Sequence, residues 1–354
     1  MAYSPIIKPS TLMNTVLYAG NATARSITGV GFQPDLVWIK PYTNGAWSHN
    51  LTDSVRGAGY GLFSDLNNAQ YNYGTGTSGS VRTFDSDGFS IGTATQVNNN
   101  SSNIVAWNWK AGTTGSGTTT GSGTGKAYSY SVSTTAGFSI VKYLGNGSAG
   151  HTIPHHLGAV PKMIIVKEVD NADDWNVYHA SLGNTKEIYL NANNAASSSD
   201  APWNNTTPTS SVFTVSADGG VNTNDASYIA YCFADVQGYS KFGSYTGNGS
   251  SSDGPFVYTG FKPSFIIRKN TDGGVTESWI MQDNKRNTSN VVDKWLEANT
   301  TATEDTAYQT DFLSNGFKMR SNNDGTNRNS TTYIYMAFAE EPFVASNFNA
   351  ATAR

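Results

Sequence analysis

Apolar residues along the chain gather in short runs that are bounded by glycine, proline or asparagine. Three of these runs share one pattern, in which a Gly-x-x-Pro turn precedes the run and a lysine ends it. They occupy residues 36–40, 163–167 and 265–269. Apolar residues at successive positions predict a strand that is covered on both faces, and proline is tolerated at the start of such a strand. The pattern therefore predicts an all-β protein.

The surroundings of these runs repeat as well. Each copy opens with a turn that joins an aromatic residue to Gly-Asn, at residues 18–21, 143–147 and 245–249. A tryptophan follows each apolar run (Trp47, Trp175 and Trp279), then a short strand near residues 85–89, 211–215 and 313–317, and then an aromatic closing strand at 104–109, 228–234 and 333–339. Landmarks that recur three times in one order predict an internal repeat. Since each copy has roughly 100 residues, we expect three tandem β-sandwich repeats, jelly-roll-like, with long loops and little helix.

The repeats set the domain boundaries. We expect an N-terminal segment at 1–13, repeat 1 at 14–110, a linker at 111–126, repeat 2 at 127–236, and repeat 3 with a C-terminal tail at 237–354. The linker is a Gly/Thr/Ser run that predicts a flexible connection or a long exposed crossing. The second junction is short and contains Tyr239 and Phe242, so we expect one mobile repeat and one rigid pair. The best helical candidate is 287–299, where Val291, Val292, Trp295 and Leu296 share one helical face.

Composition narrows the function classes. Charged residues make up 14% of the 354 residues, against about 25% in an average soluble domain. The net charge is −4 and the lysines and arginines are scattered, which disfavours nucleic-acid binding. The single cysteine, Cys232, excludes an intramolecular disulfide and lies in an apolar run that predicts a buried strand. The first twelve residues lack the apolar region of a signal peptide, and no apolar run reaches the roughly 20 residues of a membrane helix. We therefore expect synthesis in a cytoplasm and no membrane insertion.

One group of residues carries a resemblance. Residues 16–21 and 27–40, followed by 53–57, 84–89 and 105–112, resemble a repeat of unassigned function that recurs in tail-fibre and other virion proteins of bacteriophages, especially marine ones. The second and third copies depart from this pattern, since both lack the Ser-Val-Arg-Gly segment at 54–57 and the Trp-Asn-Trp strand at 107–109.

The resemblance implies a virion surface protein, made in the host cytoplasm, with tail or capsid proteins as partners. It also implies a homo-oligomer, with a trimer as the default. It implies no catalytic residues, no cofactor and no metal. A fibre normally devotes an N-terminal segment to docking, and the short segment at 1–13 leaves room for a capsid-surface role.

Aromatic residues in loops are the candidate binding residues. Tyr71, Tyr73, Trp203 and Tyr239 lie in stretches rich in glycine, asparagine or serine, which predict exposed loops. Flat rings beside amides and hydroxyls suit the faces and hydroxyls of a host-surface glycan. The alternative is that these rings pack against a neighbouring subunit.

Three polar clusters are weaker candidates. His151 and His155 could approach a metal, but Pro154 forbids a regular helix, and a polar turn is the favoured interpretation. Asp85 and Asp87 resemble the start of a calcium loop that lacks its closing acid, so a turn is favoured. The densest group of acids could cleave a glycan, although a solvated hairpin tip is favoured; its members are Glu168, Asp170, Asp173 and Asp174.

Three functions follow from these patterns. The first is a tail-fibre or appendage-type protein that attaches to host-surface glycans. The second is a capsid or tail decoration or scaffold protein without a ligand. The third and weakest is a polysaccharide depolymerase.

Overall fold

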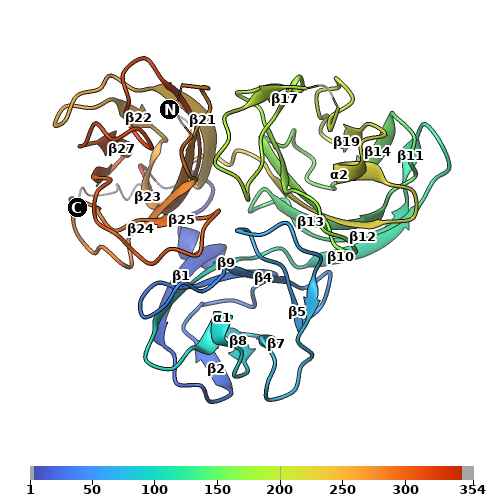
Figure 1. The fold of residues 1–354 in the computed structure, drawn as a ribbon, viewed down its shortest axis with the longest axis horizontal. Coiled ribbons are helices and arrows are strands. Elements are labelled where there is room, and N and C mark those ends of the chain that lie inside the picture. Colours follow the sequence, from blue (N-terminus) through green and yellow to red (C-terminus); the bar gives the residue numbers. More distant parts are fainter. Residues whose placement is uncertain (1–3, 200, 275, 345–354) are drawn as a thin grey trace.

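The computed structural model describes residues 4–344 except 200 and 275. The all-β class is confirmed, because the described chain contains twenty-eight strands and only short helical turns: η1 (Pro9–Thr11), α1 (Thr95–Asn98) and α2 (Gly219–Asn222). Figure 1 shows three lobes around a common centre, which we call units 1, 2 and 3 in chain order.

The units contain the following strands. Unit 1 has β1 (Met13–Ala19), β2 (Arg25–Thr28), β3 (Leu36–Pro41), β4 (Asn50–Asp53), β5 (Tyr60–Gly61), β6 (Tyr71–Asn72), β7 (Val81–Asp85), β8 (Gly88–Ile91) and β9 (Asn103–Trp109). Unit 2 has β10 (Thr113–Thr118), β11 (Thr120–Gly121), β12 (Ala127–Ser133), β13 (Phe138–Leu144), β14 (His151–Pro154), β15 (Met163–Glu168), β16 (Asn176–His179), β17 (Lys186–Glu187), β18 (Ser197–Ser198), β19 (Val212–Val215) and β20 (Ser227–Phe233). Unit 3 has β21 (Ser240–Thr246), β22 (Phe256–Tyr258), β23 (Phe261–Asn270), β24 (Ile280–Asp283), β25 (Leu296–Glu297), β26 (Thr310–Leu313), β27 (Gly316–Met319) and β28 (Thr332–Pro342).

One topology occurs three times. The larger sheets run β1-β9-β3-β4, β13-β20-β15-β16 and β21-β28-β23-β24, and the strands in each pair antiparallel. The smaller sheets are β2-β8-β7, β14-β19 and β22-β27-β26. The pairing registers fix equivalent positions, so that Trp109, Phe233 and Phe338 occupy the same place in their closing strands.

The two faces of β3 explain its continuous apolar run. Leu36 and Trp38 point into a core that all three units share, whereas Val37 and Ile39 point into a core between the two sheets of unit 1. The same alternation holds in β15, where Met163 belongs to the shared core and Ile164 belongs to the core of unit 2. A strand buried on both faces needs an apolar residue at every position.

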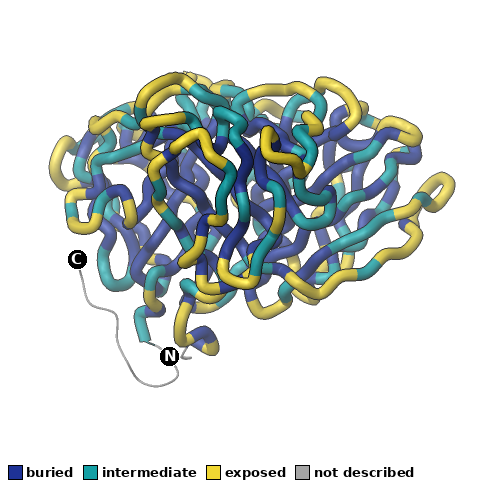
Figure 2. The backbone as a smooth tube through the Cα atoms, turned by 90° about the horizontal axis from the view of Figure 1, so that it is seen from below, coloured by how far each residue is buried: buried dark blue, intermediate teal, exposed yellow. Residues whose placement is uncertain are grey.

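Three rings meet at the centre of the molecule. The ring centroid of Trp109 lies 6.5 Å from that of Phe233 and 5.8 Å from that of Phe338, and the last two are 6.1 Å apart. Because each ring comes from a different unit, the units form one body with pseudo-threefold symmetry. Figure 2 shows the buried chain running through its interior and the exposed residues gathered in loops at its surface.

The repeated Gly-Asn turns have a steric origin. A Cβ atom on Gly20 would overlap the carbonyl oxygen of Asn99, and the same overlap would occur at Gly145 and Gly247 in the other units. The backbone N–H of Asn21 then donates to the side-chain oxygen of Asn98 at 2.9 Å. Units 2 and 3 repeat this bond from Asn146 to Asn222 and from Asn248 to Asn327, at 2.8 and 2.9 Å. The segment after each smaller sheet, which is helical in units 1 and 2 and a turn in unit 3, therefore closes on the opening turn of the same unit.

The structure corrects the interpretation of 111–126 as a flexible linker. This segment forms β10, which pairs with β12 over six residues, and β11, which pairs with β14. Tyr130 and Tyr128 lie across Gly115 and Gly117, where a Cβ atom would fall 2.6 and 2.8 Å from the hydroxyl oxygens. The two glycines thus leave the space that the rings of Tyr130 and Tyr128 occupy. Since all three units share one core, the expectation of one mobile repeat is also wrong.

The helix expected at 287–299 is absent from the structure. Leu296 and Glu297 form β25, while Val292 and Trp295 make isolated bridges to Thr310 and Asp305. Leu296 pairs with Met281 of β24, so the end of this segment is extended along the edge of that strand.

Candidate functional site

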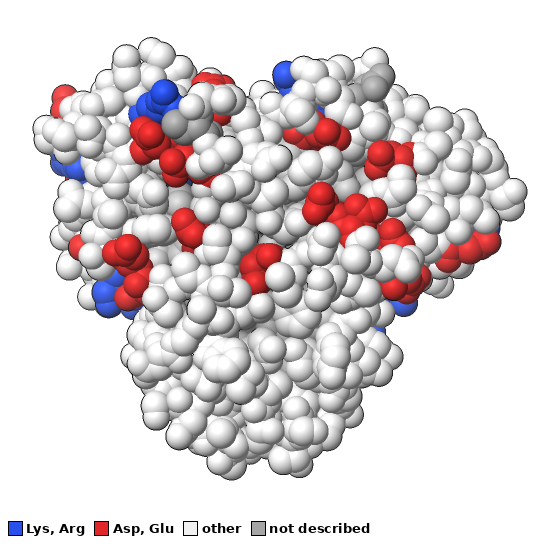
Figure 3. Space-filling model, in the orientation of Figure 1, with Lys and Arg blue, Asp and Glu red and all other residues white. Residues whose placement is uncertain are grey.

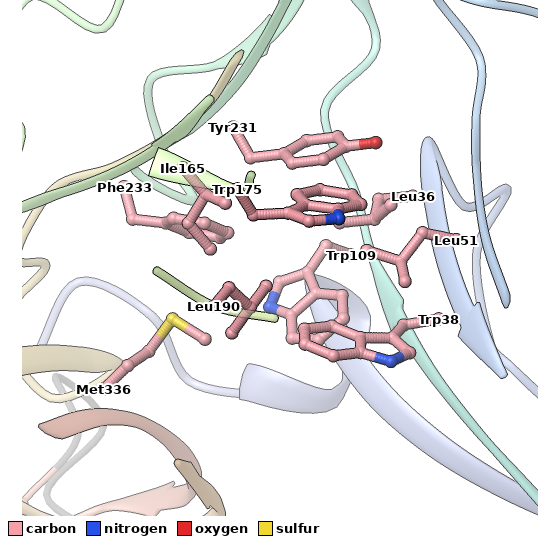
Figure 4. A pocket seen from close by; sticks show the side chains of 10 residues that line it. All are labelled: Leu36, Trp38, Leu51, Trp109, Ile165, Trp175, Leu190, Tyr231, Phe233 and Met336. Atoms are coloured by element: carbon pink, nitrogen blue, oxygen red, sulfur yellow. The ribbon is translucent and has the colours of Figure 1, made fainter. Parts of the chain in front are cut away.

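A cavity between the three units is too small for a ligand. Figure 4 shows ten side chains from all three units around it, among them Trp38, Trp109, Trp175 and Met336. Its volume is about 10 Å³, which is at most the space of one water molecule. Its lining is apolar, so the cavity is a packing gap in the shared core.

One side chain from each unit bonds to the backbone of the next around the axis. These side chains precede β4, β16 and β24 and are His49, Trp175 and Trp279. The bonds are Trp175 Nε1–H to the carbonyls of Phe63 and Leu66 at 3.0 Å, Trp279 Nε1–H to the carbonyl of Tyr189 at 2.9 Å, and His49 Nε2 with the carbonyl of Glu297 at 2.9 Å. The tryptophan landmark is thereby corrected, because the position of Trp175 and Trp279 is held in unit 1 by His49 and not by Trp47.

Two buried ion pairs follow these side chains in the sequence, one in unit 1 and one in unit 3. Arg56 Nε donates to Asp53 at 2.6 Å, and Arg286 Nε donates to Asp283 at 2.7 Å, with all four side chains almost fully buried. Each carboxylate also receives a bond from another unit: the Tyr231 hydroxyl donates to Asp53 at 2.8 Å, and Trp107 Nε1 donates to Asp283 at 3.3 Å.

Unit 2 lacks this ion pair. His179 and Leu182 stand at the equivalent positions, and the residue of unit 3 that corresponds to Tyr231 and Trp107 is Met336. The His179 ring bonds to the carbonyl of Tyr335 at 3.2 Å instead. The carboxylate and its donor are thus present or absent together, which is expected of a structural contact between units.

The lysines that end the apolar runs are buried. Lys40, Lys167 and Lys269 donate to backbone carbonyls, and two of these carbonyls, of Thr301 and Asn193, belong to a neighbouring unit. Burial lowers the pKa of all three lysines to about 8. Such a shift is also found in catalytic lysines. Here the ammonium groups bond to backbone carbonyls, at a junction between units for Lys40 and Lys269 and within unit 2 for Lys167, so we interpret them as structural.

The histidines at 151–156 are occupied by hydrogen bonds. His151 bonds to Asn222 at 2.9 Å and to Thr119 at 2.6 Å, and His155 bonds to the carbonyl of Thr209 at 3.1 Å. Burial lowers the pKa of His155 to about 4. In the part of the chain that the structure describes, no group of three or more His, Cys, Asp or Glu side chains could hold a metal ion.

These acidic candidates accept hydrogen bonds from neighbouring segments of their own unit. Both carboxylate oxygens of Asp87 bond to backbone N–H groups, of Gly29 and Gly31. In the denser acid group, Asp170 accepts from Ser227 N at 2.7 Å and Asp174 accepts from Asn191 at 2.7 Å. These bonds fix loop conformations.

The four candidate aromatic residues have different environments. Tyr71 is 58% exposed, and its ring forms an edge-to-face pair with Tyr73 at 4.5 Å. Trp203 is 1% exposed in the core of unit 2, and Tyr239 is fully buried in the shared core. The expectation that Trp203 and Tyr239 are exposed loop aromatics is therefore wrong, because apolar partners from distant segments cover them.

A second exposed aromatic pair was missed by the sequence analysis. Phe256 and Tyr258 in β22 are 43% and 57% exposed. Their strand continues from a Gly/Ser-rich loop, and its alternation with buried Val257 is the signal that could have identified them.

The surface of the molecule is largely uncharged. In Figure 3 acidic side chains lie near the centre and on units 2 and 3, whereas unit 1, the lower lobe, is almost free of charged residues on this face. None of the helices in the described chain is long and apolar enough to cross a membrane.

Comparison with known proteins identifies the family. Residues 8–342 match the model of a family described as a domain of unknown function, DUF7483, and the chain belongs to this family. No curated protein and no solved structure matches the chain.

Proposed function

We propose that the chain is a non-enzymatic structural protein of a bacteriophage particle, displayed on the particle surface in a tail fibre or similar appendage. The observation that carries this proposal is the closed body of three units around one core, with polar and mostly uncharged loops outside. Such a body suits display, since buried polar groups such as His49, Lys40 and Lys269 bond to a neighbouring unit and hold the units together. The resemblance of residues 16–21 and 27–40 to phage virion repeats supports the location.

The ligand of this surface is a host-surface glycan, and its contact residues are Tyr71 and Tyr73. The Tyr71 ring is among the most exposed large hydrophobic side chains of the described residues, and it is held by the ring of Tyr73. A fixed ring at the surface loses little entropy when it stacks on a sugar. Weak single contacts gain strength when many copies act together.

A decoration or scaffold protein without a ligand is the second candidate. The burial of Trp203 and Tyr239 favours it, because that burial removes two of the four rings available for binding. The homotrimer remains a prediction, and one chain already supplies a threefold arrangement of units. The depolymerase alternative gains no support from Asp170 and Asp174, whose carboxylates accept hydrogen bonds from Ser227 and Asn191 of the same unit.

The proposal is tested by locating the chain on purified bacteriophage particles that carry its gene. Cryo-electron microscopy should find the three-lobed body projecting from the tail or a vertex, with Tyr71 in solvent. A glycan array then compares the wild type with Tyr71→Ala, which should lose binding. Density lying flat with Tyr71 buried would support the decoration protein, and a chain absent from purified particles would contradict both candidates.

A further inference from the structure

Strand β22 combines an open edge with exposed aromatic rings. In the smaller sheet of unit 3 it is the terminal strand and pairs only with β27. Phe256 and Tyr258 lie on its outer face, while Val257 between them is buried in the core of unit 3. Exposed apolar residues on an unpaired edge are what soluble proteins usually avoid. This edge therefore requires an explanation.

The other two units show that the fold does not need these rings. The register aligns Val257 with Ile27 and Ile153, since each lies opposite the buried phenylalanine of the neighbouring strand. The outward residues at the equivalent positions are Ser26 and Thr28 in unit 1, and Thr152 and Pro154 in unit 2. Small side chains suffice in both places. The Phe256 ring lies over Gly316 of β27, but no ring covers the equivalent Gly88 of unit 1, so the sheet does not require the aromatic pair.

The backbone at this edge offers hydrogen bonds. The N–H of Thr259 donates to the carbonyl of Asn315 at 3.0 Å, toward β27. Alternate residues of a strand direct their backbone groups to opposite sides. Phe256 and Tyr258 therefore direct their N–H and C=O groups away from β27, to the open edge.

Unit 2 shows what the equivalent edge accepts. There β11 pairs antiparallel with β14, with Thr120 opposite Thr152. The N–H of Ser122 donates to the carbonyl of Gly150 at 2.9 Å, and the hydroxyls of Thr120 and Thr152 lie 2.8 Å apart. Within the described chain, β22 has no such partner. An antiparallel strand is thus the natural occupant of this edge.

We infer that the occupant is β22 of a second copy, paired antiparallel about a twofold axis. In this register Phe256 lies opposite Tyr258 of the second copy, and Val257 lies opposite Val257. The outward N–H and C=O groups of Phe256 then bond to those of Tyr258 in the second copy, and the same pair of bonds forms again across the axis. Four aromatic rings lie together on one face of the joined sheets. An isologous contact of this kind closes on itself and forms a dimer.

The neighbouring charges allow this approach. Lys318, which lies opposite Phe256 in β27, bonds to Asp253, and Arg320 bonds to Asp311. Each charge is matched within its own chain, so the approach of a second copy brings no unmatched charge toward the rings. Since β22 has only three residues, we expect a weak and concentration-dependent dimer.

Sedimentation velocity of the full chain, at concentrations up to the millimolar range, tests the inference. The wild type should shift from monomer to dimer as its concentration rises. The variant Phe256→Ser/Tyr258→Thr gives unit 3 the residues of unit 1, so it should fold normally and bind a second copy roughly tenfold more weakly. Tyr258→Pro should also weaken the dimer, because it removes an edge N–H at the position where unit 2 has Pro154.

Tyr71→Ser is the matched control, because it removes an exposed ring elsewhere and should leave the dimer unchanged. A wild type that stays monomeric overturns the inference and leaves the edge to a strand of another protein or to a sugar. An oligomer that Phe256→Ser/Tyr258→Thr does not weaken also overturns it. The sedimentation result does not bear on the proposed function, which is tested separately by locating the chain on the particle.

Discussion

The indole N–H of Trp175 in unit 2 donates to the backbone carbonyl of Phe63 in unit 1 at 3.0 Å. Trp279 joins unit 3 to unit 2 in the same way, and His49 joins unit 1 to unit 3. These bonds run around the axis in one direction and close a ring. They explain why three copies of one topology form a single body: each unit covers its neighbour's apolar sheet and satisfies its neighbour's buried carbonyls.

Replacing Trp175 tests this junction. We expect Trp175→Ala to lower the free energy of unfolding by about 3–5 kcal/mol, because it opens a cavity in the shared core and leaves buried carbonyls without a donor. The measurement is urea denaturation followed by circular dichroism. Trp47→Ala is the control, since Trp47 is only partly buried, and its loss should be clearly smaller. Equal losses would contradict the assigned equivalence.

The buried ion pair of unit 1 gives a second prediction. Arg56→Leu should cost about 3–5 kcal/mol of stability, because the Asp53 carboxylate remains buried without its cation. A triple variant, Asp53→His/Arg56→Leu/Tyr231→Met, gives the junction of units 1 and 2 the residues found at the junction of units 2 and 3. Those residues are His179, Leu182 and Met336. The triple variant should recover part of the lost stability. Denaturation of both variants provides the comparison. A triple variant less stable than Arg56→Leu would show that the three residues do not act together.

The buried histidines predict a loss of stability in acid. Burial lowers the pKa of His155 and His179 to about 4, whereas an unfolded histidine titrates near 6.5. Between these values the unfolded state binds more protons than the folded state, so stability falls as the pH falls from about 6.5 to 4. The loss should reach roughly 2–3 kcal/mol for each histidine.

The pH dependence is measured by denaturation between pH 7 and the acid limit of solubility, in wild type and in His155→Gln/His179→Gln. The variant should show a flatter profile, because glutamine takes up no proton. Identical profiles for the two proteins would mean that other groups cause the acid response.

The glycine of the opening turn gives a fourth prediction. Gly20→Ala should cost about 2–4 kcal/mol, because the new Cβ atom overlaps the carbonyl oxygen of Asn99 and the backbone must move. Gly76→Ala is the matched control, since no atom lies within 4 Å of its added Cβ, and it should change stability by less than about 0.5 kcal/mol. The measurement is a thermal melt of each variant. Equal melting temperatures would contradict the steric argument.

Sequence patterns predicted the fold class because the physics behind them is local. The apolar runs that end at Lys40, Lys167 and Lys269 are strands β3, β15 and β23, and the Gly-Asn turns lie where they were expected. The second copy of the Asp-x-x-Arg contact, at Asp283 and Arg286 in unit 3, was missed, since the two intervening residues differ from those between Asp53 and Arg56.

Features that depend on distant contacts were not predictable. Trp203 and Tyr239 stand in loop-like sequence, but partners far along the chain bury them. The composition of 111–126 indicated flexibility, because a glycine that seats the ring of Tyr130 looks the same in sequence as a glycine in a linker. The alternation of Phe256 and Tyr258 with Val257 was visible in the sequence, but only the register shows that the other units have small residues at the same positions.

The central claim is that the three units fold as one body around a shared core, and differential scanning calorimetry tests it most directly. The account predicts one transition whose calorimetric and van't Hoff enthalpies agree, and a shift of that whole transition in Trp175→Ala. Separate transitions for the units, with Trp175→Ala moving only one of them, would contradict it.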